Sequence, residues 1–444
     1  MAATATAVSD AGMALEAQTR WHPAEFVFWA ATLLPFVLFP NHLQLASQVA
    51  ITALFALSLD LILGYAGIVS LGHAAFFGLG AYTAGILSVH RWGDPFVGLV
   101  AAMAVAGLFG YATSFIVARF RHLTLIMITL GLGFLLHEVA NQASWLTGGS
   151  DGLQGVQIGP LLGLFRFDLY GYTAYTYSLI VLFLVFLAVR RLIHSPFGLS
   201  LRGIRENPVR MPAIGAPSAS HIRKVYTISA VIAGIAGAVL AQTTSTVSLG
   251  AINFERSADV LIILVLGGAG RLYGGLIGAI IFLVARDQFS GLAPQFWYFW
   301  MGHLLVLVVL FVPGGLLDAP GRIRNAWRRR RAEGRQAEFV RRAAGVSLLA
   351  SSYALLVISL LWWWSFFGKA PLALGQLLPC LLHSTGPCAD TALAAYAIVG
   401  QRPYPPSIMW IGLGCLAVGW LLVAIRRPRA KALPGTSTGG STVP

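Results

Sequence analysis

Apolar residues form long runs along most of the chain, and short polar or charged segments separate them. A helix that crosses a bilayer needs about 20 mostly apolar residues, so these runs predict membrane-spanning helices. They lie near 25–40, 45–63, 74–89, 95–118, 123–146, 169–189, 225–247, 258–268, 272–289 and 297–312, and then near 343–366 and 407–425. The run at 258–268 is too short to cross alone and is expected to begin earlier. The pattern predicts an all-α fold, a polytopic transmembrane helical bundle with ten core spans and two extra C-terminal spans.

Composition and charge agree with a membrane protein. Of 444 residues, 57% are hydrophobic and 10% are charged, and the mean hydropathy is +0.75, whereas soluble domains carry about 25% charged residues. If the runs alternate in direction, 24 of the 30 Lys and Arg fall on one side. The positive-inside rule assigns that side to the cytoplasm, together with both termini. The net charge of +14 therefore indicates orientation in a lipid bilayer, with no nucleic acid as partner.

The same pattern divides the chain into five segments. We expect no cleaved signal peptide, because the N-terminal segment holds no short apolar core before a cleavage site. The segments are a cytoplasmic N-terminal segment (1–24), a transmembrane domain (25–318), an Arg-rich cytoplasmic linker (319–342), a two-span segment (343–425) and a cytoplasmic tail (426–444).

Glycines interrupt the apolar stretch 57–87, and a second glycine-rich interruption, GGAGRLYGG, lies at 267–275. Both follow an inward crossing and precede an outward one. Close helix packing explains such glycines, and a transport path is the alternative, because paired interruptions mark binding sites in transporters. The residues expected to line a path are Gly64, Tyr65, Gly67, Ser70, Gly72, His73, Thr129 and Gly131.

Polar side chains at membrane depth also have two interpretations. His73 fits a structural residue or a proton carrier, and the carboxylates of Asp60, Glu138 and Asp259 fit structural pairing. Small residues of helix 229–241, from Ala230 to Ala241, recur three or four apart and predict a helix contact, within the chain or with a partner.

Two long loops could meet soluble partners, 194–224 on the cytoplasmic side and 147–168 outside. In the first, Ser195 can cap and Pro196 can open a short helix. This loop could be a solvated charged loop, and it could equally be a docking element.

The motifs that are missing limit the chemistry. The chain has no phosphate-binding GxxxxGK[ST], no HExxH and no Cys/His cluster. We therefore expect no metal, no cofactor, no catalytic residue and no ATP hydrolysis by this chain. Cys380 and Cys388 fall in a loop placed outside and could form a disulfide there.

Four motifs occur in order: LDLILGYAGIVSLGHAAFFGLGAY, LTGGSDGLQGV, SPFGLSLRGIRENPVRMPAIG and VLGGAGRLYGGLIGA. Over residues 40–318 the chain closely resembles the LivM-like permeases of branched-chain amino-acid ABC importers. The resemblance implies a bacterial inner-membrane complex of a periplasmic solute-binding protein, two related permease subunits and two cytoplasmic ABC ATPase subunits. It also implies that loop 194–224 holds a coupling helix that rests on the ATPase, with site residues Arg202, Arg205, Glu206, Asn207 and Gly215.

The loop departs from the family pattern at Pro208 and Pro212, which are expected to shorten or kink that helix. The leading hypothesis is an importer permease for branched-chain amino acids or a related small polar solute such as urea or another amino acid. A secondary transporter driven by an ion gradient and a non-transporting scaffold are the alternatives.

Overall fold

The computed structural model describes residues 21–318, 321 and 324, apart from 91, 121, 161–164, 166, 168–170, 293–296 and 313. The chain divides into two units, residues 1–320 and 321–444, and the description concerns the first. The extra C-terminal spans and the pair Cys380 and Cys388 lie outside the described residues.

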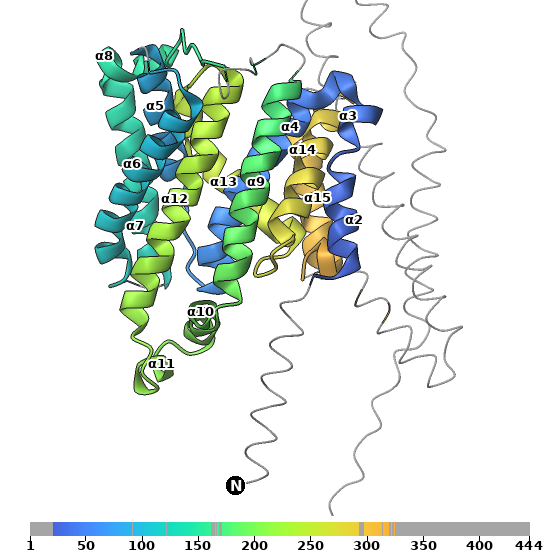
Figure 1. Cartoon of the computed structure of the whole chain (residues 1–444). Coiled ribbons are helices and arrows are strands. Elements are labelled where there is room, and N and C mark those ends of the chain that lie inside the picture. Colours follow the sequence, from blue (N-terminus) through green and yellow to red (C-terminus); the bar gives the residue numbers. More distant parts are fainter. Residues whose placement is uncertain are drawn as a thin grey trace, which may run out of the picture. The chain divides into compact units, whose positions relative to one another are not determined.

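Helices make up nearly all of the described secondary structure, with one isolated backbone bridge between Leu153 and Val247. The long helices run side by side, and the short helices α10 and α11 lie beyond one end of α9 and α12 (Figure 1). The helices are α2 (Pro23–Ala31), α3 (Pro35–Leu38), α4 (Leu43–Asp60), α5 (Ala74–Val89), α6 (Pro95–Val117), α7 (His122–Gln142), α8 (Ser144–Thr147), α9 (Tyr172–Ile193), α10 (Pro196–Glu206), α11 (Arg210–Ala213), α12 (Ser218–Thr244), α13 (Phe254–Gly267), α14 (Gly274–Leu292) and α15 (Trp297–Phe311).

Five described helical segments are long and apolar enough to cross a membrane, and α5, α15 and the α2–α3 region are apolar but shorter. The predicted all-α, polytopic membrane fold is confirmed. Two expected spans differ in extent. Residues 25–40 form two helices because Pro35 lacks the N–H that a continuous helix would use. Helix α12 begins at Ser218 instead of near 225, and its first two turns consist of residues that precede the apolar run.

The centre of the bundle is packed around α12. Gly237 lies against the carbonyl oxygen of Phe77 in α5, and Gly234 lies against Ala106 of α6. A Cβ atom at Gly237 would overlap that oxygen, so only glycine permits this approach. The small-residue face of α12 therefore contacts helices of the same chain.

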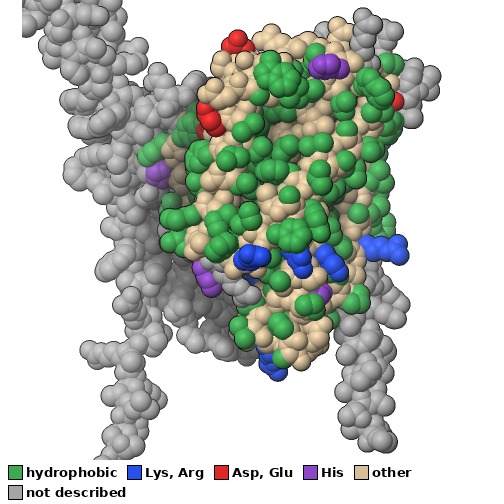
Figure 2. Space-filling view, turned by 90° about the vertical axis from the view of Figure 1, so that its left-hand side faces the viewer, with side chains coloured by type: hydrophobic (Ala, Val, Ile, Leu, Met, Phe, Trp, Pro, Cys, Tyr) green, Lys and Arg blue, Asp and Glu red, His purple; other side chains and the backbone are tan. Residues whose placement is uncertain are grey.

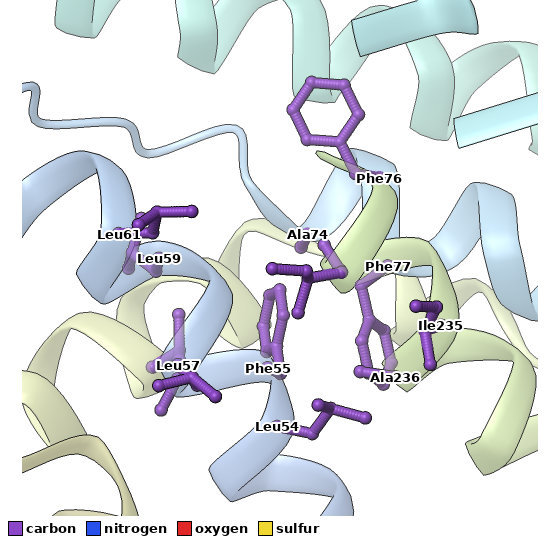
Figure 3. Close-up of a cluster of buried hydrophobic side chains, with 14 of the residues drawn as sticks. Leu54, Phe55, Leu57, Leu59, Leu61, Ala74, Phe76, Phe77, Ile235 and Ala236 are labelled. Carbon is purple, nitrogen blue, oxygen red and sulfur yellow. The ribbon is translucent and has the colours of Figure 1, made fainter. Parts of the chain in front are cut away.

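Large apolar side chains fill the space between α4, α5 and α12. Figure 3 shows Leu54 and Phe55 of α4, Phe76 and Phe77 of α5, and Ile235 of α12 around one interior. Phe55 and Phe77 contact each other with ring centroids 4.6 Å apart. Because lipid is as apolar as these side chains, close packing is what favours their contact.

Charged side chains are distributed unevenly along the bundle. Hydrophobic side chains spread over the face shown in Figure 2, where Lys and Arg gather toward the lower part and Asp and Glu toward the upper end. The lower part is the end that carries α10 and α11 (Figure 1).

Candidate functional site

The first break, residues 61–73, follows directly after the last residue of α4. The helix continues as a π-helical turn, Leu61–Tyr65, and an irregular segment then leads to α5. A Cβ atom at Gly64 would overlap Asp60 Oδ1 and the backbone nitrogen of Gly270, and Gly67 has φ +73°. Single π-helical turns are rare in proteins, and those that occur often lie at functional sites.

The second break, residues 268–273, separates α13 from α14. Gly268 has φ +110° and Gly270 has φ +81°, a conformation that favours glycine. The backbone N–H of Gly270 donates a 2.7 Å hydrogen bond to Oδ1 of Asp60, which is 1% exposed. The two glycine-rich interruptions, far apart in the sequence, are therefore in direct contact.

Helix α10 attaches to this contact from outside the bundle. As predicted, Ser195 caps it by accepting a hydrogen bond from the N–H of Gly198. Leu201 and Ile204 are buried on its inner face. Arg205, one position further, donates from Nη1 to the carbonyl oxygen of Gly64.

Arg202 supports the same attachment, since its guanidinium lies 5.4 Å from the centre of the Tyr65 ring. We call Arg205, Gly64, Asp60 and Gly270 the α10 link. It is a hydrogen-bonded connection between a helix outside the bundle and both breaks within it.

The rest of the predicted coupling residues shape the loop beyond α10. Glu206 ends the helix, and Asn207 Oδ1 accepts hydrogen bonds from the N–H groups of Val209 and Arg210 at the start of α11. Gly215 adopts φ +88°, and a Cβ atom added there would meet nothing within 4 Å. Helix α10 ends at Glu206, two residues before Pro208, and Pro212 lies in the separate helix α11. That the prolines shorten the helix relative to the family stays a prediction.

His73 lies in a fully buried polar cluster between α4, α5 and α12. Its Nε2 is 2.9 Å from Ser58 Oγ and 3.4 Å from Ser229 Oγ. Ser58 Oγ donates to the carbonyl of Phe55, and Ser229 Oγ donates to the carbonyl of Ser58. With both hydroxyl hydrogens assigned to carbonyls, the ring tautomer that fits carries its hydrogen on Nε2 and donates to Ser58. No described group bonds to Nδ1.

Of the predicted path residues, Thr129 and Ser70 are buried, whereas Gly131 is exposed. Thr129 is buried, its Oγ1 accepts a 3.3 Å hydrogen bond from the N–H of Leu71, and a Cβ atom at Gly72 would overlap its carbonyl oxygen. Gly131 is exposed and has nothing within 4 Å of its Cβ position. Ser70 is fully buried without a described hydrogen-bond partner.

Sequence reasoning missed several residues that hold these elements. Ser257 of α13 accepts a 2.9 Å hydrogen bond from the N–H of Ala74 at the start of α5. Glu25 of α2 pairs with Arg190 of α9 and accepts a 2.9 Å hydrogen bond from Tyr273. The only sequence signal was a polar residue in an apolar surrounding, which does not name its partner. In the described part of the chain, no group of three or more His, Cys, Asp or Glu residues is placed to hold a metal ion.

Known proteins place the chain in a family. Residues 41–311 match the family described as branched-chain amino acid transport system / permease component. The high-affinity branched-chain amino acid transport system permease proteins LivM of Salmonella typhimurium and Escherichia coli are each 28% identical over 314 residues, which cover 65% of this chain and 72% of theirs.

The fructose import permease protein FrcC of Rhizobium meliloti is 24% identical over 274 residues, 59% of this chain and 74% of its own. No solved structure matches the chain. The family match spans both breaks and α10 and covers more than half of the chain, so the chain belongs to the family of permease components of branched-chain amino acid transport systems.

Proposed function

We propose that this chain is a transmembrane permease subunit of an ABC importer for branched-chain amino acids or a related small polar solute. It would work with a second, related permease subunit, cytoplasmic ABC ATPase subunits and a periplasmic solute-binding protein, in the bacterial inner membrane with both termini inside. The family membership and the names of the LivM relatives support the solute class. The FrcC relative keeps other small polar solutes within the proposal.

The α10 link is the observation that carries the proposal. The end with α10 is the cation-rich end, which the positive-inside rule assigns to the cytoplasm. A cytoplasmic ATPase that moves α10 would pull on the Gly64 carbonyl through Arg205 and, through Asp60, on Gly270. Work is transmitted only by contacts that differ between two states, and this link joins the docking helix to both breaks.

The environment of His73 gives little support to a secondary transporter. A proton added to the ring would go to Nδ1, which faces no described acceptor in a fully buried position. A buried N–H without an acceptor costs about 1–3 kcal/mol. We assign His73 a structural role, joining α5 to α4 and α12.

The test is uptake by the full complex, in which the chain is produced together with the proposed ATPase, second permease and binding-protein subunits and reconstituted in vesicles. We expect ATP-dependent uptake of leucine, isoleucine or valine. Uptake by the chain alone on a pH or sodium gradient, without ATP, would refute an importer.

Arg205→Leu tests the route of coupling. Loss of a hydrogen bond from a charged group costs about 1.5–3 kcal/mol, which corresponds to roughly 10- to 150-fold in a coupling equilibrium. We expect uptake per ATP hydrolysed to fall strongly in the assembled complex. Arg191→Leu, at the exposed end of α9, removes the same charge without touching the link. Equal losses in both variants would refute coupling through Arg205.

A further inference from the structure

A cavity of about 380 Å³ lies at the end of the bundle away from α10. It is bordered by the first part of α4, the end of α12 with the loop that follows, the start of α13 and the last turns of α14. Its charged lining residues are Arg256, Arg286 and Asp287. We call it the outer cavity, because α12 reaches it from the cytoplasmic end proposed above.

The two arginines lack polar partners among the described residues. Neither forms an ion pair or a hydrogen bond with another described side chain or carbonyl. The guanidinium of Arg256 lies 5.4 Å from the ring centre of Phe77, and that of Arg286 lies 5.0 Å from that of Trp297. An aromatic ring contacts the flat face of a guanidinium and leaves its N–H edge available for two parallel bonds to a carboxylate.

Nearby carboxylates leave the arginines available. Asp259 of α13 acts electrostatically on both arginines, and Glu255 acts on Arg256, each from beyond ion-pairing distance. Glu255 also accepts a hydrogen bond from Tyr298. Neither carboxylate lines the cavity. Its wall therefore carries two cations and one anion, Asp287.

Neutral polar groups surround these charges. The hydroxyls of Thr244 and Ser290 donate to the carbonyls of Leu240 and Asp287, so their oxygens can accept from a bound group. The amide of Gln48 in α4 adds both a donor and an acceptor.

Apolar side chains, including Leu45 and Leu283, complete the wall. A volume of about 380 Å³ lies within the range of about 300–1,000 Å³ for small-molecule sites. The combination matches a zwitterion with an apolar side chain.

We propose that the outer cavity is a binding subsite for an α-amino acid, in which Arg256 and Arg286 bind the carboxylate, Asp287 binds the ammonium group, and the leucines face the side chain. The assignment of this subsite to the outer side of the membrane rests on the proposed function. It differs from the glycine breaks, which lie at the cytoplasmic end.

The direct test is saturation-transfer NMR on the purified full chain in lipid nanodiscs with L-leucine. We expect contact signals from the leucine methyl groups that fall about tenfold or more in the Arg256→Gln/Arg286→Gln variant, because each lost bond to a charged group weakens binding by that order. L-leucinamide, which lacks the carboxylate, should give signals as weak with the wild-type chain. Arg191→Gln serves as the matched control, since Arg191 lies at the opposite end.

Equal signals from wild type and the double variant would overturn the subsite. Arg286 is exposed, so R286Q alone provides the same comparison if the double variant fails to fold. Uptake by the reconstituted complex separates the two proposals. Wild-type ATP-driven leucine uptake with an unchanged KM in R286Q overturns the subsite alone, whereas absence of leucine uptake by the wild-type complex overturns the proposed function.

Discussion

Replacement of Gly237 by alanine tests whether the contact between α5 and α12 depends on the missing side chain. The added Cβ atom would overlap the carbonyl oxygen of Phe77 and lie 2.8 Å from the nitrogen of Ala81. Both are backbone atoms, so no side-chain rotation can relieve the overlap, and the two helices must separate. Gly131 of α7 is the matched control, because a Cβ atom there meets nothing within 4 Å.

The expected magnitude follows from two opposing terms. Alanine in place of glycine within a helix gains about 0.5–1 kcal/mol at either position. Forcing an extra carbon into a packed interior costs about 1–3 kcal/mol. G131A should therefore raise the free energy of unfolding and G237A should lower it. The difference between the variants isolates the packing cost, about 1–3 kcal/mol.

Thermal unfolding of the purified chain in detergent, followed by tryptophan fluorescence, measures this difference. One kcal/mol corresponds to roughly 2–4 °C in a domain of 150–250 residues. G237A should unfold several degrees below G131A. A G237A midpoint at or above that of G131A would refute the claim that this glycine sets the helix separation.

Three further predictions concern single contacts. Ser195→Ala removes the N-cap of α10 and should cost about 1 kcal/mol, seen as faster hydrogen exchange at the Gly198 amide; unchanged exchange would contradict the cap. Glu25→Gln weakens the pair with Arg190 and should lower the unfolding midpoint, with less effect in a background that already carries Arg190→Met; equal effects in both would argue against the pair. His73→Gln keeps a donor near Ser58 and should leave the pH profile of uptake unchanged, whereas a shifted profile would restore His73 as a proton carrier.

Local sequence patterns were sufficient for most of the fold. Apolar runs predicted the helices because the length of a span is fixed by bilayer thickness. Ser195 and Pro196 predicted the start of α10 because capping involves only neighbouring residues. The glycine interruptions also predicted where the helices break.

The sequence did not reveal which groups meet at those breaks. Arg205 lies 141 positions from Gly64, and Asp60 lies 210 positions from Gly270. The family resemblance placed Arg205 in a coupling loop, and the apolar surroundings placed Asp60 in some structural pairing, but neither argument named a partner. It also gave no sign that Arg256 of α13 and Arg286 of α14 line one cavity.

The sequence by itself therefore determined the fold class, the positions of the helices and the end of the bundle that carries the positive charge. Those properties depend on residue type and spacing within one segment. Only the tertiary structure decided that α12 packs against α5 and α6, that Arg205 reaches the first break, and that His73 is enclosed by serines. These contacts arise when several helices pack at once, because the position of each side chain then depends on residues far away in the chain.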